Sequence, residues 1–350
     1  MDKKKFAAIA LVALMTFGIT ATALAHDGWS QTNTPIIAQG EVSYVDLLFG
    51  NHANEHSSYR ITGQWSKDTS KVYVTTPVGK KVDITSTMFY TGEAATETAP
   101  AVNNGYLATF SSSAPGAYII SVEADSIYKA TRTLRNAKSF VAVSDIPTLE
   151  RIKLLKGFSR EINSDRAEWV PVFNPAAITP GEQVSVQLLL KGKPLVDTEA
   201  TLIQRSNSKA QKLKTNAEGI ISFKTGSADY YLLRAKPNTD EKKDGEYGAT
   251  SYEATMTFTV QNGSVKLPYS KVQAVPYVYV NGKLATAPGL SIKAGSTFAD
   301  AAFIKQYVDA TYASDQPGAL RTIVESLQGS IEYLPAVGDT RAAVLIYMKE

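Results

Sequence analysis

The sequence predicts a mainly β protein with two consecutive antiparallel β-sandwiches, of the immunoglobulin or prealbumin-like kind, followed by a small α+β module. Short β-rich runs separated by turn residues recur through most of the chain, which is typical of sandwich domains. Apolar residues at clear helical spacing occur near the C-terminal end. A length of 350 residues favours two or three domains.

The N-terminus has the three-part layout of a secretory signal peptide. Residues 1–5 include three lysines, an apolar run extends from Phe6 to about Gly18, and small residues continue to Ala25. The apolar run is too short to span a membrane comfortably. We therefore expect residues 1–25 to be cleaved after Ala25. The mature chain is then secreted, to the cell surface or the periplasm, without a transmembrane segment.

Composition excludes several classes of site. The chain has no cysteine, which rules out disulfides and thiolate metal ligands. Removal of the leader takes away three lysines and one aspartate, leaving 33 basic and 32 acidic side chains. Such a balanced charge gives no reason to expect electrostatic binding of nucleic acid or of a membrane surface.

The first sandwich is expected over residues 26–145. Its β-rich runs are separated by turn residues such as Pro77, Gly79, Pro115 and Gly116. The predicted strands cover residues 42–49, 71–77, 105–110, 116–124 and 139–143. A connector follows over 146–165, where apolar residues among charged ones indicate either a short helix or a packed connector.

The second sandwich is expected over residues 166–263. Residues 181–190 alternate in polarity as a half-buried strand does. Further strands are predicted at 199–203, 220–223, 230–235 and 252–260, and the charged stretch Asn238 to Gly248 is predicted to be an exposed, mobile loop.

The remaining residues, 264–350, are expected to form the α+β module. The predicted order is a strand at 275–280, an Asn281-Gly282 turn and a short strand at 291–293. Helices at 297–312 and 319–327 follow, and then strands at 330–333 and 342–348.

The chain has three histidines, His26, His52 and His56, all near the start of the mature protein. Cleavage after Ala25 would make His26 the first residue, so its α-amine and imidazole could chelate one metal ion together. An α-amine has a reference pKa of roughly 7.7–8.0, so a metal can displace its proton near neutral pH. His52 and His56 would lie about 13 Å apart in a regular strand, so a folded loop is needed for them to share an ion.

Asp27 and Glu55 could each add an oxygen ligand to this site. Imidazole and amine nitrogens suit nickel, cobalt and copper, and the sequence does not determine which of the three binds. The alternative is that His26 belongs to a frayed terminus and that His52 and His56 are solvated loop residues. Trp29, close to the new terminus, could oppose such fraying by packing.

Residues 26–263 resemble a bacterial family of exported proteins labelled as an additional periplasmic component of cobalt or nickel uptake systems. The resemblance implies metal binding and a membrane metal transporter as partner. Asn51 separates Gly50 from His52, where the family has Gly-His. The residues that carry the resemblance are Ala25-His26-Asp27-Gly28-Trp29, Leu47 to His52, Pro171-Val172-Phe173-Asn174-Pro175, Gly181 to Leu195, Asn216-Ala217-Glu218-Gly219 and Tyr252 to Phe258.

Residues from about 272 to 350 are similar to the small N-terminal domain of copper amine oxidases. The similarity lies in Val278-Tyr279-Val280-Asn281-Gly282-Lys283, a following helix and Gly329-Ser330-Ile331-Glu332-Tyr333. No histidine follows His56, so we assign this module no metal.

The sequence therefore predicts an exported, non-enzymatic protein that binds or delivers a divalent transition metal ion (nickel, cobalt or copper) through His26, His52 and His56. The alternative is a cell-surface structural or interaction module that binds cell-wall polysaccharide or protein and has no metal role. A third hypothesis is an oxidative metalloenzyme that uses the terminal histidine as a chelating arm.

Overall fold

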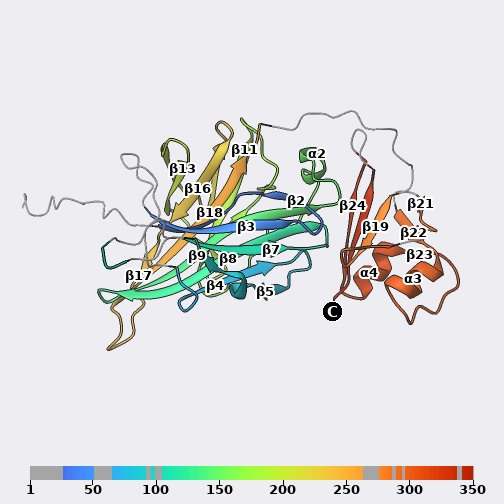
Figure 1. Ribbon diagram of the computed structural model, residues 1–350, viewed down its shortest axis with the longest axis horizontal. Coiled ribbons are helices and arrows are strands. Elements are labelled where there is room, and N and C mark those ends of the chain that lie inside the picture. The colour runs from blue at the N-terminus through green and yellow to red at the C-terminus, as the bar shows by residue number, and fades with distance from the viewer. Residues whose placement is uncertain are drawn as a thin grey trace, which may run out of the picture.

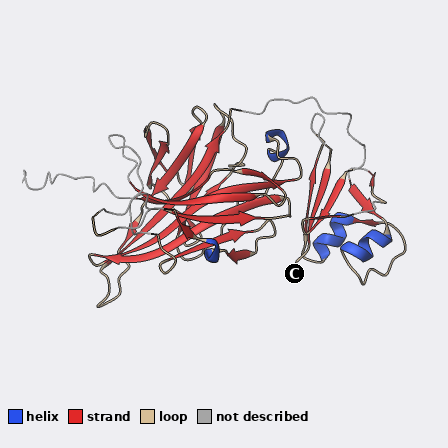
Figure 2. Ribbon diagram, in the orientation of Figure 1, coloured by secondary structure: helices blue, strands red, loops and turns tan. Residues whose placement is uncertain are grey.

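The computed structural model describes residues 27–50, 65–91, 96–98, 105–262, 276–285, 289–293, 296–336 and 341–349. Within these residues the chain is mainly β, as predicted, with strands in several sheets and only short helices (Figure 2). No helix in the described part of the chain is long and apolar enough to cross a membrane.

The first sheet has four antiparallel strands in the order β1-β3-β7-β6. Their bounds are Asp27–Thr32 for β1, Val42–Gly50 for β3, Tyr106–Ser111 for β7 and Phe89–Tyr90 for β6. Val45, Leu47 and Phe49 of β3 point into a hydrophobic core shared with the large sheet described next. The short 3-10 helix Thr85–Thr87 precedes β6.

A ten-stranded sheet runs through both predicted sandwiches, with β14-β13-β16-β18-β9-β8-β4-β5 as its main path (Figure 1). The parallel pairing of β18 with β9 joins its two halves, and places Glu253 opposite Arg135. β2 pairs with β9, and β17 pairs with β18. The bounds are Ala210–Lys214 (β14), Glu199–Gln204 (β13), Asp229–Ala235 (β16), Ala249–Val260 (β18), Thr131–Ser144 (β9), Gly116–Tyr128 (β8), Ser70–Thr75 (β4), Lys81–Asp83 (β5), Ile36–Ala38 (β2) and Asn238–Thr239 (β17).

Nearly every residue of strand β9 is buried. Because successive side chains of a strand point to opposite sides, both faces of β9 are covered. Ala137, Val141 and Val143 lie in the core beneath the first sheet. Phe140 and Ala142 lie in a second core on the other face. The near-continuous apolar run at the end of this strand follows from its central position.

The second core is closed by a smaller sheet in which β11 (Gln183–Leu190) pairs with β10 (Ala167–Pro171), β12 (Lys193–Pro194) and β15 (Ile220–Lys224). Trp169 of β10 is fully buried there and donates from Nε1 to the Ala254 carbonyl at 3.2 Å.

The connector forms a four-residue helix, α2 (Leu149–Ile152), followed by a packed segment. Thr148 caps the helix by accepting a hydrogen bond from the Arg151 N–H through its hydroxyl oxygen. Ile152, Leu155 and Phe158 are buried in the second core. Both alternatives left open by the sequence thus occur in succession.

The C-terminal module contains a four-stranded sheet, β20-β19-β25-β24, a three-stranded sheet, β21-β22-β23, and two helices (Figure 1). The bounds are Tyr277–Val280 (β19), Lys283–Leu284 (β20), Ser291–Lys293 (β21), Ser296–Ala299 (β22), Ala301–Tyr307 (α3), Gly318–Ala319 (β23), Leu320–Ser326 (α4), Ser330–Leu334 (β24) and Ala343–Tyr347 (β25). The helix predicted over 297–312 is shorter than expected. Asp300 caps its start by accepting a hydrogen bond from the Phe303 N–H at 2.8 Å, and Phe298 pairs in a sheet instead.

The two faces of the module's larger sheet have different partners. Val344 and Ile346 of β25 pack against the module's own helices. Leu345 and Tyr347, which point the other way, join the second core of the sandwich region. Buried Arg151 reinforces this contact by donating to the Leu334 carbonyl at 3.3 Å and the Pro335 carbonyl at 3.2 Å.

Candidate functional site

The structure describes one of the five predicted metal-site residues. His26, His52, Glu55 and His56 lie outside the described residues, whereas Asp27 is the first residue of β1. Among the described residues there is no group of three or more histidine, cysteine, aspartate or glutamate side chains that could hold a metal ion. The described part of the predicted site is therefore the start of β1, next to His26 in the sequence, and the end of β3, which precedes His52 and His56.

The pairing of β1 with β3 brings the two attachment points of the predicted ligands together. Asp27 lies opposite Gly50 at the end of this antiparallel ladder. His26 directly precedes Asp27 in the sequence, and His52 follows Gly50 by two residues. Paired Cα atoms in such a ladder are about 4.5–5.5 Å apart. The segments that carry His26 and His52 therefore begin at neighbouring positions of the fold.

The other edge of β1 is held by side chains of β18. Glu253 accepts a hydrogen bond from the Gly28 N–H through Oε1 at 2.6 Å. Thr255 donates to the Gly28 carbonyl at 2.7 Å, and Thr257 donates to the Ser30 carbonyl at 2.6 Å. These contacts satisfy backbone groups that a strand edge would otherwise leave without partners. They also fix the position of the strand on the large sheet.

A cluster of charged side chains surrounds the start of β1. Asp27 forms an ion pair with Arg234 of β16. Glu253 lies 3.3 Å from Arg135 Nε and 3.6 Å from Lys236 Nζ, measured from its Oε2. Both carboxylates are buried, with 2% of Asp27 and 1% of Glu253 exposed. Buried carboxylates are tolerated here because cations from neighbouring strands compensate them.

Burial is the largest influence on Asp27 and raises the pKa of its carboxyl from 3.8 to about 6. The positive charge of Arg234 opposes this rise, and the nearby Glu253 carboxylate adds to it. Removing a carboxylate from water disfavours its charged form, which explains the direction. Asp27 consequently changes charge in a range close to neutral pH.

Two aromatic side chains fix the strand from opposite faces. Trp29 is 1% exposed and packs with Leu48, Ile203 and Leu232. This is the packing role that the sequence suggested for Trp29. On the other face, Trp65 lies so close to Gly28 that a Cβ atom there would be 2.4 Å from Cζ2 of its ring. Glycine is required at this position by the approach of the indole ring.

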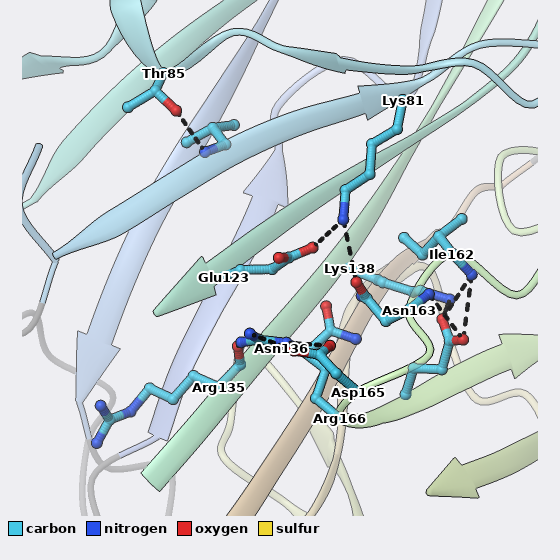
Figure 3. Close-up of polar contacts among 12 residues, drawn as sticks. Lys81, Thr85, Glu123, Arg135, Asn136, Lys138, Ile162, Asn163, Asp165 and Arg166 are labelled. Carbon is cyan, nitrogen blue, oxygen red and sulfur yellow. Dashed lines mark hydrogen bonds and ion pairs between the residues drawn. The ribbon is translucent and has the colours of Figure 1, made fainter. Parts of the chain in front are cut away.

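A second buried ion pair lies on the other face of β9. It belongs to a network of contacts that is distinct from the candidate site. Lys138 pairs with Glu168 of β10, and 1% and 0% of their side chains are exposed. In Figure 3 the Arg135 side chain points away from Lys138, as the alternation of side chains along β9 requires. Glu168 also accepts hydrogen bonds from the Ile162 and Asn163 N–H groups, each at 3.2 Å.

Sequence reasoning identified Asp27 and Trp29 but missed Glu253, Arg135 and Arg234. A signal for Glu253 exists, because it is a charged residue within the otherwise apolar and threonine-rich run from Tyr252 to Val260. Its partners Gly28 and Arg135 precede it by 225 and 118 residues in the sequence, and only the arrangement of the strands brings them together. The described part of the site can fix the start of β1 and exchange a proton at Asp27.

Residues 23–239 match the model of a protein family described as Domain of unknown function (DUF4198). No curated protein matches the chain. Among solved structures, a DUF4785 family protein from Legionella pneumophila is 11% identical, with a TM-score of 0.23, and the match covers 59% of this chain and 50% of that one.

Two further structures are similar at the same low level. Trypsin-activated alpha-2-macroglobulin from Escherichia coli is 13% identical with a TM-score of 0.21, and the match covers 70% of this chain and 16% of that one. The Escherichia coli adhesin FdeC is 13% identical with a TM-score of 0.19, and the match covers 66% and 65%. The chain spans about half the length of the Legionella protein and a smaller share of the macroglobulin.

Proposed function

We propose that this protein, which belongs to the DUF4198 family of domains of unknown function, is an exported protein that binds a divalent transition metal ion. The ligands are the α-amine and imidazole of His26 in the mature chain, completed by His52 and His56. The metal is nickel, cobalt or copper. The proposal depends on cleavage between Ala25 and His26, because only a free terminus supplies the amine.

The observation that carries the proposal is the register pair between Asp27 and Gly50. It supports convergence of the ligands because both ligand-bearing segments begin at the same end of the β1–β3 ladder. The hydrogen bond from Gly28 to Glu253 supports it further, since it anchors the strand two residues from the proposed amine. An anchored strand loses less entropy on chelation than a frayed terminus does.

The donor set fits these metals through its nitrogen ligands. Imidazole suits copper, nickel and other borderline ions, and affinities in such sites generally rise from Co²⁺ through Ni²⁺ to Cu²⁺. The Asp27 carboxylate is ion-paired with Arg234, so we assign it the role of orienting the terminus instead of ligating the metal. Glu55 remains a candidate oxygen ligand.

The resemblance to cobalt and nickel uptake components supports delivery of the metal to a membrane transporter as the biological role. Secretion to the periplasm or the cell surface is part of the same proposal. The C-terminal module then serves as an attachment without a metal of its own.

Isothermal titration calorimetry with Cu²⁺, Ni²⁺ and Co²⁺ tests the proposal on protein whose chain starts at His26. We expect one equivalent to bind, and a variant with His26, His52 and His56 all changed to alanine to lose this binding. Replacement of three exposed lysines that belong to neither β1 nor residues 50–56, Lys193, Lys212 and Lys242, is the matched control. Equal affinity of the triple-histidine variant and the parent protein would show that the histidines are not the ligands.

A further inference from the structure

A recessed site lies at the turn end of the β8–β9 hairpin, and none of its lining residues is a predicted metal ligand. It is a cavity of about 500 Å³ between the hairpin and the loop that follows β17. Its lining includes Asp125, Ile127, Arg132, Glu246 and Tyr247. This volume lies within the range of roughly 300–1,000 Å³ that is usual for small-ligand sites.

The polar groups on the hairpin side are fixed in position. Arg132 Nη2 lies 3.1 Å from one oxygen of Asp125, and Arg166 Nη1 lies 3.1 Å from the other. Arg132 Nη1 donates to the Tyr247 hydroxyl oxygen at 3.4 Å. Asp125 and Arg132 remain accessible, with 42% and 36% of their side chains exposed. They therefore offer pre-positioned hydrogen-bonding groups to a ligand.

The loop on the opposite side, for which the sequence predicts exposure and mobility, is largely exposed and has its own hydrogen bonds. Lys243 and Tyr247 exchange two backbone hydrogen bonds of 2.9 and 3.0 Å. The Gly248 N–H donates to the Ala130 carbonyl at 2.8 Å, which ties the loop to the hairpin turn. Both walls of the cavity are thus defined by the fold.

The charges of the lining balance each other. Asp125 and Glu246 are paired with Arg132 and Lys243 respectively. The two carboxylates oppose binding of phosphates or other anions, and the two cations oppose binding of metal ions. A ligand that matches this surface is uncharged and carries several groups that both donate and accept hydrogen bonds.

The site also offers exposed apolar surface. Ile127 lines the cavity and is 52% exposed. A sugar ring combines a C–H face, which packs on such side chains, with hydroxyls at its rim, which pair with fixed carboxylate and guanidinium groups. We propose that this cavity binds a neutral saccharide, as a single unit or as part of a chain.

Titration calorimetry of the mature protein with chitotetraose and cellotetraose, two uncharged oligosaccharides, tests the proposal. We expect at least one of them to bind, and Arg132→Leu to weaken its affinity at least tenfold by removing the guanidinium that orients Asp125 and Tyr247. Arg321→Leu, which removes a comparable surface arginine paired with Glu325 in the module, should bind like the parent protein.

Ile127→Ser provides a second variant that leaves the ion pairs intact and should also weaken binding. Circular dichroism confirms that each variant is folded. The proposal is overturned if neither oligosaccharide binds at millimolar concentration. It is also overturned if folded Arg132→Leu and Ile127→Ser bind as the parent does, or if the anionic polymer polygalacturonate binds better than the neutral sugars.

Discussion

At the scale of single residues, Gly28 shows how closely the start of β1 is fitted to its surroundings. We predict that Gly28→Ala destabilises the protein by about 1–3 kcal/mol, because the new methyl group would overlap the Trp65 ring. Urea unfolding monitored by tryptophan fluorescence measures this change. Gly248→Ala is the matched control, since a Cβ atom there meets no heavy atom within 4 Å and the change should stay within about 0.5 kcal/mol. Equal effects of the two substitutions would contradict the account.

Asp27 is predicted to make stability depend on pH. Its folded-state pKa of about 6 lies above the ordinary 3.8, so its contribution is fully present below about pH 4 and is lost as the pH rises through 6. Two pKa units correspond to about 3 kcal/mol. The unfolding free energy of the parent protein minus that of Asp27→Asn should therefore fall by about this amount between pH 4 and pH 7. Titrating groups remote from Asp27 cancel in this difference, and a pH-independent difference would contradict the raised pKa.

The residues that sequence could and could not identify differ in physical kind. Trp29 was predictable as an anchor because a large aromatic side chain near a terminus gains free energy on burial. Arg135, Arg234 and Glu253 were not predicted, because their role depends on which strands are neighbours in the large sheet. Charged residues in strands usually face solvent, and these are exceptions created by mutual pairing.

At the scale of elements, β9 and β10 are joined by the ion pair between Lys138 and Glu168. Burial lowers the pKa of Lys138, and the Glu168 carboxylate partly opposes that shift. We predict that Lys138→Met costs about 3–5 kcal/mol of unfolding free energy, because it leaves a buried carboxylate without its cation. The double variant Lys138→Met/Glu168→Leu should cost less than Lys138→Met alone. Urea unfolding of the single and double variants measures the coupling, and strictly additive losses would contradict it.

Strands were largely predictable, whereas their partners were not. The run from residue 181 to 190 alternates in polarity and forms β11 as expected. The parallel pairing of β9 with β18 joins segments more than 100 residues apart, and no local pattern encodes it. The helix predicted over 297–312 begins later than expected, because Ser296–Ala299 pairs with two other short strands. Short apolar runs are ambiguous between helix and strand for this reason.

At the scale of the whole molecule, the C-terminal module is held against the sandwich region by one face of its sheet. Arg151 is fully buried, pairs with Asp145 at 2.8 Å and donates to the carbonyl groups of the last residue of β24 and of the residue after it. We predict that Arg151→Met weakens this docking and increases hydrogen exchange in β24 and β25, while exchange in β11 changes little. Hydrogen–deuterium exchange mass spectrometry makes this comparison. Unchanged protection of β24 and β25 would mean that Arg151 does not hold the module.

The large sheet also gives the proposed metal site its position in the molecule. β1 lies between β3 of the first sheet and β18 of the large sheet, so both halves of the chain fix the residue that follows His26. The mainly β fold class was predictable from sequence, and the candidate ligands stay a prediction. The supporting charge cluster, by contrast, forms only when strands distant in sequence assemble.

The central claim is that the free α-amine of His26 is a metal ligand. Its most direct test compares Cu²⁺ and Ni²⁺ affinities of two proteins by calorimetry, after mass spectrometry has confirmed their N-termini. One starts at His26, and the other carries a Gly-Ser-Gly-Ser extension before His26, so that all three histidines remain but the amine is moved away. The account predicts that the extension weakens binding at least tenfold. Equal affinities would show that the terminal amine takes no part.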